Sequence, residues 1–183
     1  MKKNLCILIC MISFTTFGQT GKPAYMLYDS AGNKVVYQKM MEELAFVDIV
    51  FFGELHNDPV AHWLQFEMAE YFKEKAGENL IFGAEMFEAD NQLIINEYLD
   101  GLISVRNFEQ EARLWPNYQT DYKPVFEFAK KNNLRFIATN IPRRYASMVH
   151  KKGFEILDTL SGHAKQYIAP LPVAYDPELS CYK

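Results

Sequence analysis

Acidic, imidazole and basic side chains follow three separate apolar runs in this 183-residue sequence. Glu54 and His56 come after the first run, Glu85 closes the second, and Asn140 and Arg143 follow the third. In open parallel sheets, ligands bind outside the carboxyl ends of the strands. These five residues are therefore candidates for the chemistry of the protein.

Glu54 and His56 lie two positions apart in a segment that leaves a predicted strand, so their side chains can face the same way. This spacing suits either a shared metal ion or a carboxylate–imidazole acid–base pair. Burial of an unpaired Glu85 would favour its neutral form and suit a general acid or base. The structural alternative is that Glu54 caps a backbone amide and Glu85 pairs with Arg143.

Two further residues, His62 and Tyr122, join Arg143 as candidates at predicted helix starts. His62 falls in the first turn of a helix that starts at Pro59, although a partly exposed histidine on the core side is an alternative. Arg143 lies at a predicted helix start, where a positive side chain gains nothing from the helix dipole. An anionic ligand would explain this placement, and a solvated surface arginine is the alternative. Tyr122 precedes a Lys-Pro pair at another helix start.

Alternating strands and helices are predicted to position these residues. From Tyr25, two short strands flank a turn at 30–33 and indicate a β-hairpin. The later runs are apolar without alternation, which is typical of parallel strands buried on both faces. We therefore predict a three-layer α/β fold, with a mostly parallel sheet flanked by helices, and expect an incomplete domain because three strands are few. The predicted strands are 47–53, 80–86 and 134–139, and the predicted helices are 38–46, 59–75, 90–102, 107–114, 122–132 and 142–151.

Residues 1–18 are typical of a secretory signal peptide, with two lysines and an apolar run too short to span a bilayer. A buried N-terminal strand or helix is the alternative. The remaining residues, 19–183, form the predicted domain, in which 17 Lys and Arg face 23 Asp and Glu. This negative balance argues against a generic nucleic-acid binder. Cys181 is the single cysteine of that domain, and Cys10 lacks the small preceding residue of a lipoprotein signal, so we expect a soluble exported protein.

Several of these stretches together resemble the ChaN-like haem-binding family, part of the haem-uptake and Tiki superfamily. The resemblance rests on Val50 to Gln65, Phe82 to Phe87, Trp115, Tyr122-Lys-Pro and Asn140 to Arg143. It implies that 19–183 is the N-terminal part of a ChaN-like α/β domain that binds haem.

The resemblance also implies an exported protein of haem and iron uptake, periplasmic or secreted and associated with the outer membrane. In this family two haems can stack face to face in a dimer, with each iron held by a tyrosine and a histidine nearby. A homodimer and an outer-membrane haem-uptake system are thus the expected partners. No motif here matches the iron-binding tyrosine, and Arg143 is a candidate partner for a haem propionate. The candidate haem-site residues are Glu54, His56, His62, Glu85, Tyr122, Asn140 and Arg143.

The same superfamily contains hydrolases, which leaves a second hypothesis open. Glu54, His56 and Glu85 look like the catalytic positions of erythromycin esterase-like and Tiki-type enzymes. A metal-dependent or acid–base hydrolase is therefore the alternative function. A third hypothesis is a structural or partner-binding domain in which these residues form a buried ion network. The sequence favours a haem-binding protein over an enzyme.

Overall fold

The computed structural model describes residues 23–176 and 178–180, and the chain divides into two compact units, Met1–Val35 and Val36–Lys183. The predicted signal peptide and Cys181 lie outside the described residues. Within the described part of the chain, no helix is both long and apolar enough to cross a bilayer.

The first unit contains the predicted hairpin. Strand β1 (Leu27–Tyr28) pairs antiparallel with β2 (Lys34–Val35). The Asp29 carboxylate holds the turn, because its Oδ1 accepts hydrogen bonds from the backbone N–H groups of Ala31 (2.9 Å) and Asn33 (2.8 Å). Gly32 adopts a positive φ of 82° there, which a residue without Cβ does at little cost.

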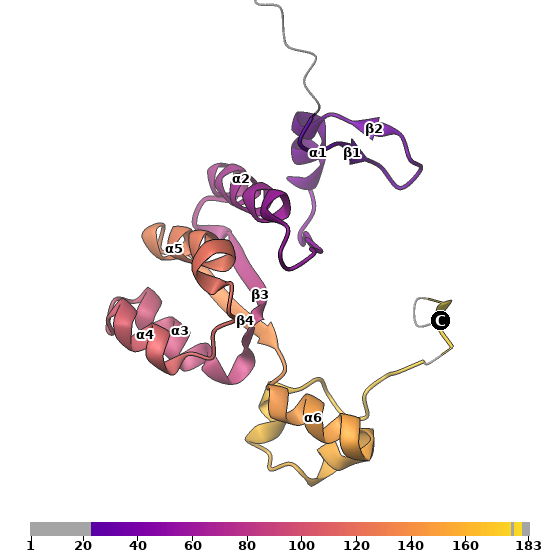
Figure 1. The fold of residues 1–183 in the computed structure, drawn as a ribbon, viewed down its shortest axis with the longest axis vertical. Helices are drawn as coiled ribbons and strands as arrows, with labels where there is room; N and C mark the ends of the chain where they lie inside the picture. Colours follow the sequence, from indigo (N-terminus) through magenta and orange to yellow (C-terminus); the bar gives the residue numbers. More distant parts are fainter. Residues whose placement is uncertain (1–22, 177, 181–183) are drawn as a thin grey trace, which may run out of the picture. The chain divides into compact units, whose positions relative to one another are not determined.

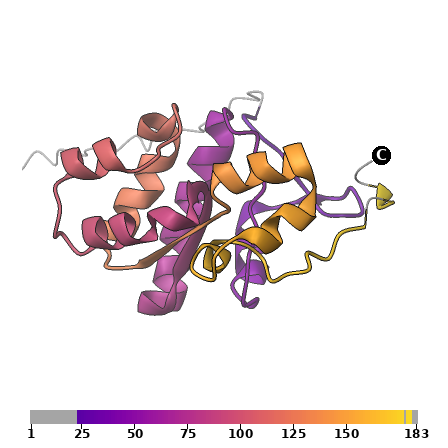
Figure 2. The same ribbon diagram turned by 90° about the horizontal axis from the view of Figure 1, so that it is seen from below.

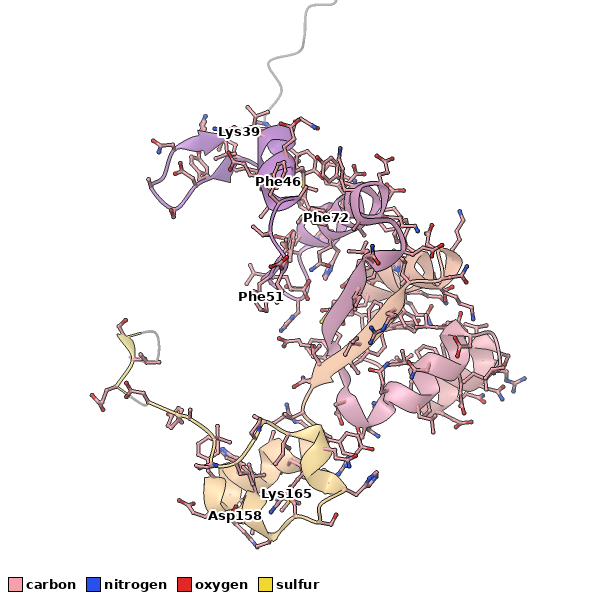
Figure 3. The ribbon with its side chains drawn as sticks, turned by 180° about the vertical axis from the view of Figure 1, so that it is seen from behind. Lys39, Phe46, Phe51, Phe72, Asp158 and Lys165 are labelled. Carbon is pink, nitrogen blue, oxygen red and sulfur yellow. The ribbon has the colours of Figure 1, made fainter. Side chains whose placement is uncertain are left out.

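Each predicted helix is present in the second unit, with shifted boundaries. The α-helices are α1 (Tyr37–Leu44), α2 (Pro59–Ala76), α3 (Gln92–Leu99), α4 (Val105–Glu111), α5 (Lys123–Lys131) and α6 (Arg143–Lys152). A π-helical turn, η3 (Tyr118–Tyr122), leads into α5. Short 3-10 turns are η1 (Gly77–Asn79), η2 (Ala89–Asn91), η4 (Phe154–Thr159) and η5 (Ala164–Tyr167). Near the C-terminal end, Lys165 donates a hydrogen bond of 2.9 Å to the Asp158 carbonyl (Figure 3).

Two parallel strands form the sheet of this unit. Strand β3 (Ile81–Glu88) pairs with β4 (Arg135–Asn140), with Phe82 opposite Phe136. The chain between them forms α3, α4, η3 and α5 (Figures 1 and 2). Their apolar faces meet one face of the strands in an aromatic core of Phe87, Tyr98, Phe108, Tyr118, Tyr122, Phe126 and Phe136. The predicted α/β class with parallel strands and an N-terminal hairpin is confirmed.

The predicted strand over 47–53 is wrong. This segment has no regular secondary structure, and Phe51 is 92% exposed. Phe46 and Phe51 lie on the connection between α1 and α2 (Figure 3). A strand needs a neighbour for its backbone N–H and C=O groups. Among the described residues β3 pairs with β4 alone, so this apolar segment has no ladder to join.

Burial of both strand faces is also not observed. Ile81 and Glu85 on β3, and Ile137 on β4, are exposed on the face away from the aromatic core. The physical reason is that the crossover elements α3, α4 and α5 all pack against the opposite face. The α3 residue Gln92 covers part of the β4 edge, because its side-chain amide donates to the Phe136 carbonyl (2.9 Å) and accepts from Ala138 N (2.8 Å).

Candidate functional site

Polar side chains from three segments meet around Glu54. The first segment is 53–58, which precedes α2. The second is the beginning of α2, where the Asp58 side chain caps the helix by accepting from Val60 N (2.8 Å) and Pro59 supplies the first position. This start fixes where His62 points. The third segment is η3 with the loop before it.

Glu54 is the centre of the cluster, and its side chain is only 6% exposed. Its Oε1 accepts a hydrogen bond from the Tyr122 hydroxyl (2.9 Å), and its Oε2 accepts one from Gln65 Nε2 (2.6 Å). The Nδ1 atoms of His56 and His62 lie 3.2 Å and 3.3 Å from the same carboxylate. A buried carboxylate is costly unless donors surround it, and here the Tyr122 hydroxyl and the Gln65 amide donate to it with two imidazoles beside them.

His56 is the exposed member of the cluster, with 53% of its side chain accessible. Because its Nδ1 faces the Glu54 carboxylate, the ring donates through Nδ1–H and leaves Nε2 with a free lone pair. Among the described residues, no partner occupies Nε2. The Trp115 ring packs against the imidazole in a T-shaped pair, at a centroid distance of 4.8 Å. This arrangement presents a ring nitrogen to a ligand.

His62 is buried behind His56, which differs from the partly exposed histidine considered as an alternative. Its Nδ1 lies 3.2 Å from Gln65 Oε1, and its Nε2 lies 3.2 Å from the His56 carbonyl. Asp121 Oδ2 is 3.6 Å from Nε2. Both ring nitrogens are thus enclosed by protein acceptors, and His62 supports the cluster without reaching its surface.

Tyr122 is buried by its neighbours and donates to Glu54. Burial, together with the nearby Glu54 carboxylate, raises the pKa of the Tyr122 phenol to about 12. The Thr120 hydroxyl, with smaller contributions from Asn117 and His62, holds the pKa of Asp121 below its ordinary value. At neutral pH, Tyr122 is therefore a hydrogen-bond donor and Asp121 an acceptor.

The structure places the other predicted residues outside this cluster. Glu85 is exposed on the open face of β3, and Arg143 is exposed at the start of α6. Neither makes a hydrogen bond or ion pair within the described part of the chain, so the proposed Glu85–Arg143 pair is not formed. Asn140 ends β4 opposite Glu88 and makes no side-chain hydrogen bond with described residues.

A separate ion cluster follows the same strand ends. Arg113 donates to Glu88 Oε2 (3.0 Å) and also pairs with Asp90, and Arg144 pairs with Asp90 as well. Both arginine side chains are half exposed, so this cluster ties the segment after α4 and the start of α6 to the end of β3 and to η2 at the surface.

Gln65, Asn117 and Asp121 belong to the site although the sequence alone did not single them out. Gln65 follows His62 by three positions on α2, and that helical spacing was the available signal. Asn117 and Asp121 join the site through η3. A π-helical turn has no sequence signature of this kind, so their approach to His56 could not be predicted.

Two comparisons with known proteins bear on this site. The family model "Haem-binding uptake, Tiki superfamily, ChaN" matches residues 40–182. The chain belongs to this family. A solved structure described as cofacial heme binding to ChaN of Campylobacter jejuni is similar, with a TM-score of 0.59 at 15% identity. The alignment covers 70% of this chain and 52% of that one, so the chain spans about half the length of the solved relative. Comparison with curated proteins gives no match.

Membership of the haem-binding uptake family raises the question of whether the described residues fit a haem. A porphyrin needs apolar contact surface and an axial donor to iron. Ile49, Phe51 and Leu55 are exposed apolar side chains directly before His56, whose Nε2 is free. The donor set therefore fits a haem. Within the described residues, no group of three His, Cys, Asp or Glu side chains is arranged to hold a bare metal ion.

Proposed function

We propose that this protein binds haem at the surface formed by His56 and the apolar segment 46–55, as an exported component of iron uptake. The observation that carries the proposal is the half-exposed His56 imidazole, which the buried Glu54 carboxylate holds from behind. A carboxylate hydrogen-bonded to Nδ1 fixes the tautomer and makes Nε2 a better donor to iron.

The apolar segment supplies the second requirement. Exposed apolar side chains rarely gather on a soluble protein without a partner, and here they lead directly to the exposed imidazole. The ring of a haem would cover them, and its iron would face His56. A bound haem would supply an iron that accepts a nitrogen ligand, and this chain holds the His56 imidazole for that role.

Export, a periplasmic or secreted location, outer-membrane association and a homodimer that forms on haem binding are parts of the same proposal. The lysine-led apolar run of residues 1–18 supports export. Family membership supports the role in haem uptake. We also propose Arg143 as a propionate partner, because its exposed guanidinium has no acidic partner among the described residues.

Titration with haemin and with metal-free protoporphyrin tests the proposal. Both probes have the same ring and the same propionates, and only haemin carries iron. We expect haemin to give a saturable, shifted Soret band and to bind at least about tenfold more tightly, as one axial bond would require. Absence of saturable haemin binding would overturn the haem assignment. Equal affinity for both probes would overturn the role of His56 at the iron.

A further inference from the structure

The loop before η3 contacts His56 from a part of the sequence about sixty residues away. Asn117 Nδ2 donates a hydrogen bond of 2.7 Å to the His56 carbonyl, and the same nitrogen donates one of 2.7 Å to Asp121 Oδ2. An amide nitrogen has two protons, so these bonds use both. The Asp121 carboxylate is an acceptor only, and this fixes which end of the amide faces His56.

The His56 backbone is held by other members of the cluster too. Its carbonyl also lies 3.2 Å from His62 Nε2 and 3.4 Å from the Tyr122 hydroxyl. These contacts restrain the peptide on one side of the imidazole. They do not restrain the rotation of the imidazole ring itself.

Trp115 restrains the ring. Its indole meets the imidazole edge-on, with an interplanar angle of 85°, and also packs on Tyr122 at 5.8 Å. Tyr122 in turn donates to Glu54, the acceptor for His56 Nδ1. The backbone and the ring of His56 are thus fixed by two side chains of one short loop, 112–117.

We propose that Asn117 and Trp115 are positioning residues that hold His56 with Nδ1 on Glu54 and Nε2 toward the ligand. The effect of these residues on ligand binding rests on the proposed haem function, whereas the contacts that restrain His56 exist without haem. The π-helical turn makes this restraint possible, because it follows Asn117 directly, places Tyr122 beside the same carbonyl and places Asp121 at the second proton of the Asn117 amide. Such turns recur at functional sites.

The test compares Asn117→Ala with Asn132→Ala. Asn132 also donates its amide to a backbone carbonyl, that of Phe128 at 2.8 Å, but lies at the end of α5 away from His56. Nitrogen chemical shifts of His56 in haem-free protein report its tautomer. We expect the Nδ1–H form in the wild type and in Asn132→Ala. In Asn117→Ala we expect a shift toward the Nε2–H form that free histidine prefers.

Trp115→Leu and Trp115→Phe provide an independent arm, because neither substitution removes a hydrogen-bond donor or acceptor of the cluster. We expect Leu to shift the tautomer and Phe to restore it, because Phe keeps an aromatic edge against the imidazole. A merely structural role would lower the melting temperature of these variants without moving the tautomer. Wild-type tautomer in both Asn117→Ala and Trp115→Leu would overturn the proposal.

Haemin titration of the same variants separates this inference from the proposed function. We expect haemin affinity to fall about tenfold in Asn117→Ala and to be unchanged in Asn132→Ala. If the wild type binds no haemin while the tautomer shifts as expected, the haem function fails and the positioning role stands. If the wild type binds haemin and Asn117→Ala binds it equally well with an unchanged tautomer, the positioning role fails.

Discussion

Glu54 and Glu85 show how residues of one type acquire different roles from their surroundings. The sequence placed both at strand ends. In the structure Glu54 is enclosed by donors from α2 and η3, and Glu85 lies exposed on the open sheet face. A glutamate therefore gains hydrogen-bond donors only where other elements cover it. Of these two residues, Glu54 is covered by α2 and η3, and Glu85 is not.

Replacement of Glu54 by Gln should destabilise the protein. The amide cannot accept from every donor around it, so at least one buried group loses its partner, at a cost of about 1–3 kcal/mol in the free energy of unfolding. Urea unfolding measures this change. The matched control is Glu85→Gln, for which we expect a change within about 0.5 kcal/mol. Equal effects of the two substitutions would contradict the assignment of Glu54 as the buried centre.

The Tyr122 phenol should lose its proton late in an alkaline titration. Its pKa is raised from 10.0 to about 12, so between these values the unfolded state binds fewer protons than the folded state. The stability that Tyr122 contributes is therefore complete below pH 10 and is lost as the pH rises toward 12. Ultraviolet absorbance of tyrosinate measures the titration. Tyr122→Phe should remove one late step, and an unchanged curve would refute the burial and pairing described for this phenol.

The same raised pKa bears on the tyrosine ligand that the family resemblance implies. A phenol that stays protonated at neutral pH and donates to Glu54 is not in the tyrosinate form that binds ferric iron. In the haem-free protein, Tyr122 therefore contributes to the site as a hydrogen-bond donor to Glu54.

At the scale of elements, helices were predicted better than strands, and particular residues show why. Asp58 and Pro59 mark the start of α2, and these capping signals are local in sequence. The apolar run at 47–53 resembles a strand equally well, but a strand forms only when another strand pairs with it. The sequence pattern does not show which partner is present.

The capping of α2 by Asp58 can be tested directly. Asp58→Ala removes the acceptor for Val60 N and Ala61 N and should lower the free energy of unfolding by about 0.5–2 kcal/mol. Because His62 lies in the first turn of α2, fraying of that turn should also expose the buried His62 side chain to solvent. Asp58→Asn keeps a capping oxygen and is the control. If Asn is as damaging as Ala, the effect does not come from the cap.

At the scale of the whole molecule, the candidate site was predicted in part. Glu54 and His56 were identified because they follow an apolar run, although that run is not a strand here. Asn117 was not identified, because its approach to His56 depends on the crossover from β3 through α3, α4 and η3. Contacts between residues far apart in sequence follow from the packed fold and have no local pattern.

Exposed and buried phenylalanines of this molecule should respond differently to substitution. Phe51 is 92% exposed and Phe126 is fully buried in the aromatic core. Phe51→Ser should change the free energy of unfolding by no more than about 0.5 kcal/mol. It should weaken haemin binding by about tenfold to a hundredfold, since burial of one such side chain contributes roughly 1.5–3 kcal/mol.

Phe126→Ala should lower the free energy of unfolding by about 3–5 kcal/mol. Urea unfolding and Soret titration of both variants measure these effects. A large stability loss in Phe51→Ser would show that segment 46–55 is buried in solution and is not a ligand surface.

Haemin titration of His56→Ala beside the wild type tests whether His56 binds the haem iron. His150→Ala is the matched control, because it removes an exposed histidine from α6. We expect a saturable Soret shift in the wild type and in His150→Ala, and at least about a tenfold loss of affinity with an altered band position in His56→Ala. The same affinity and the same Soret band in all three proteins would contradict iron binding by His56.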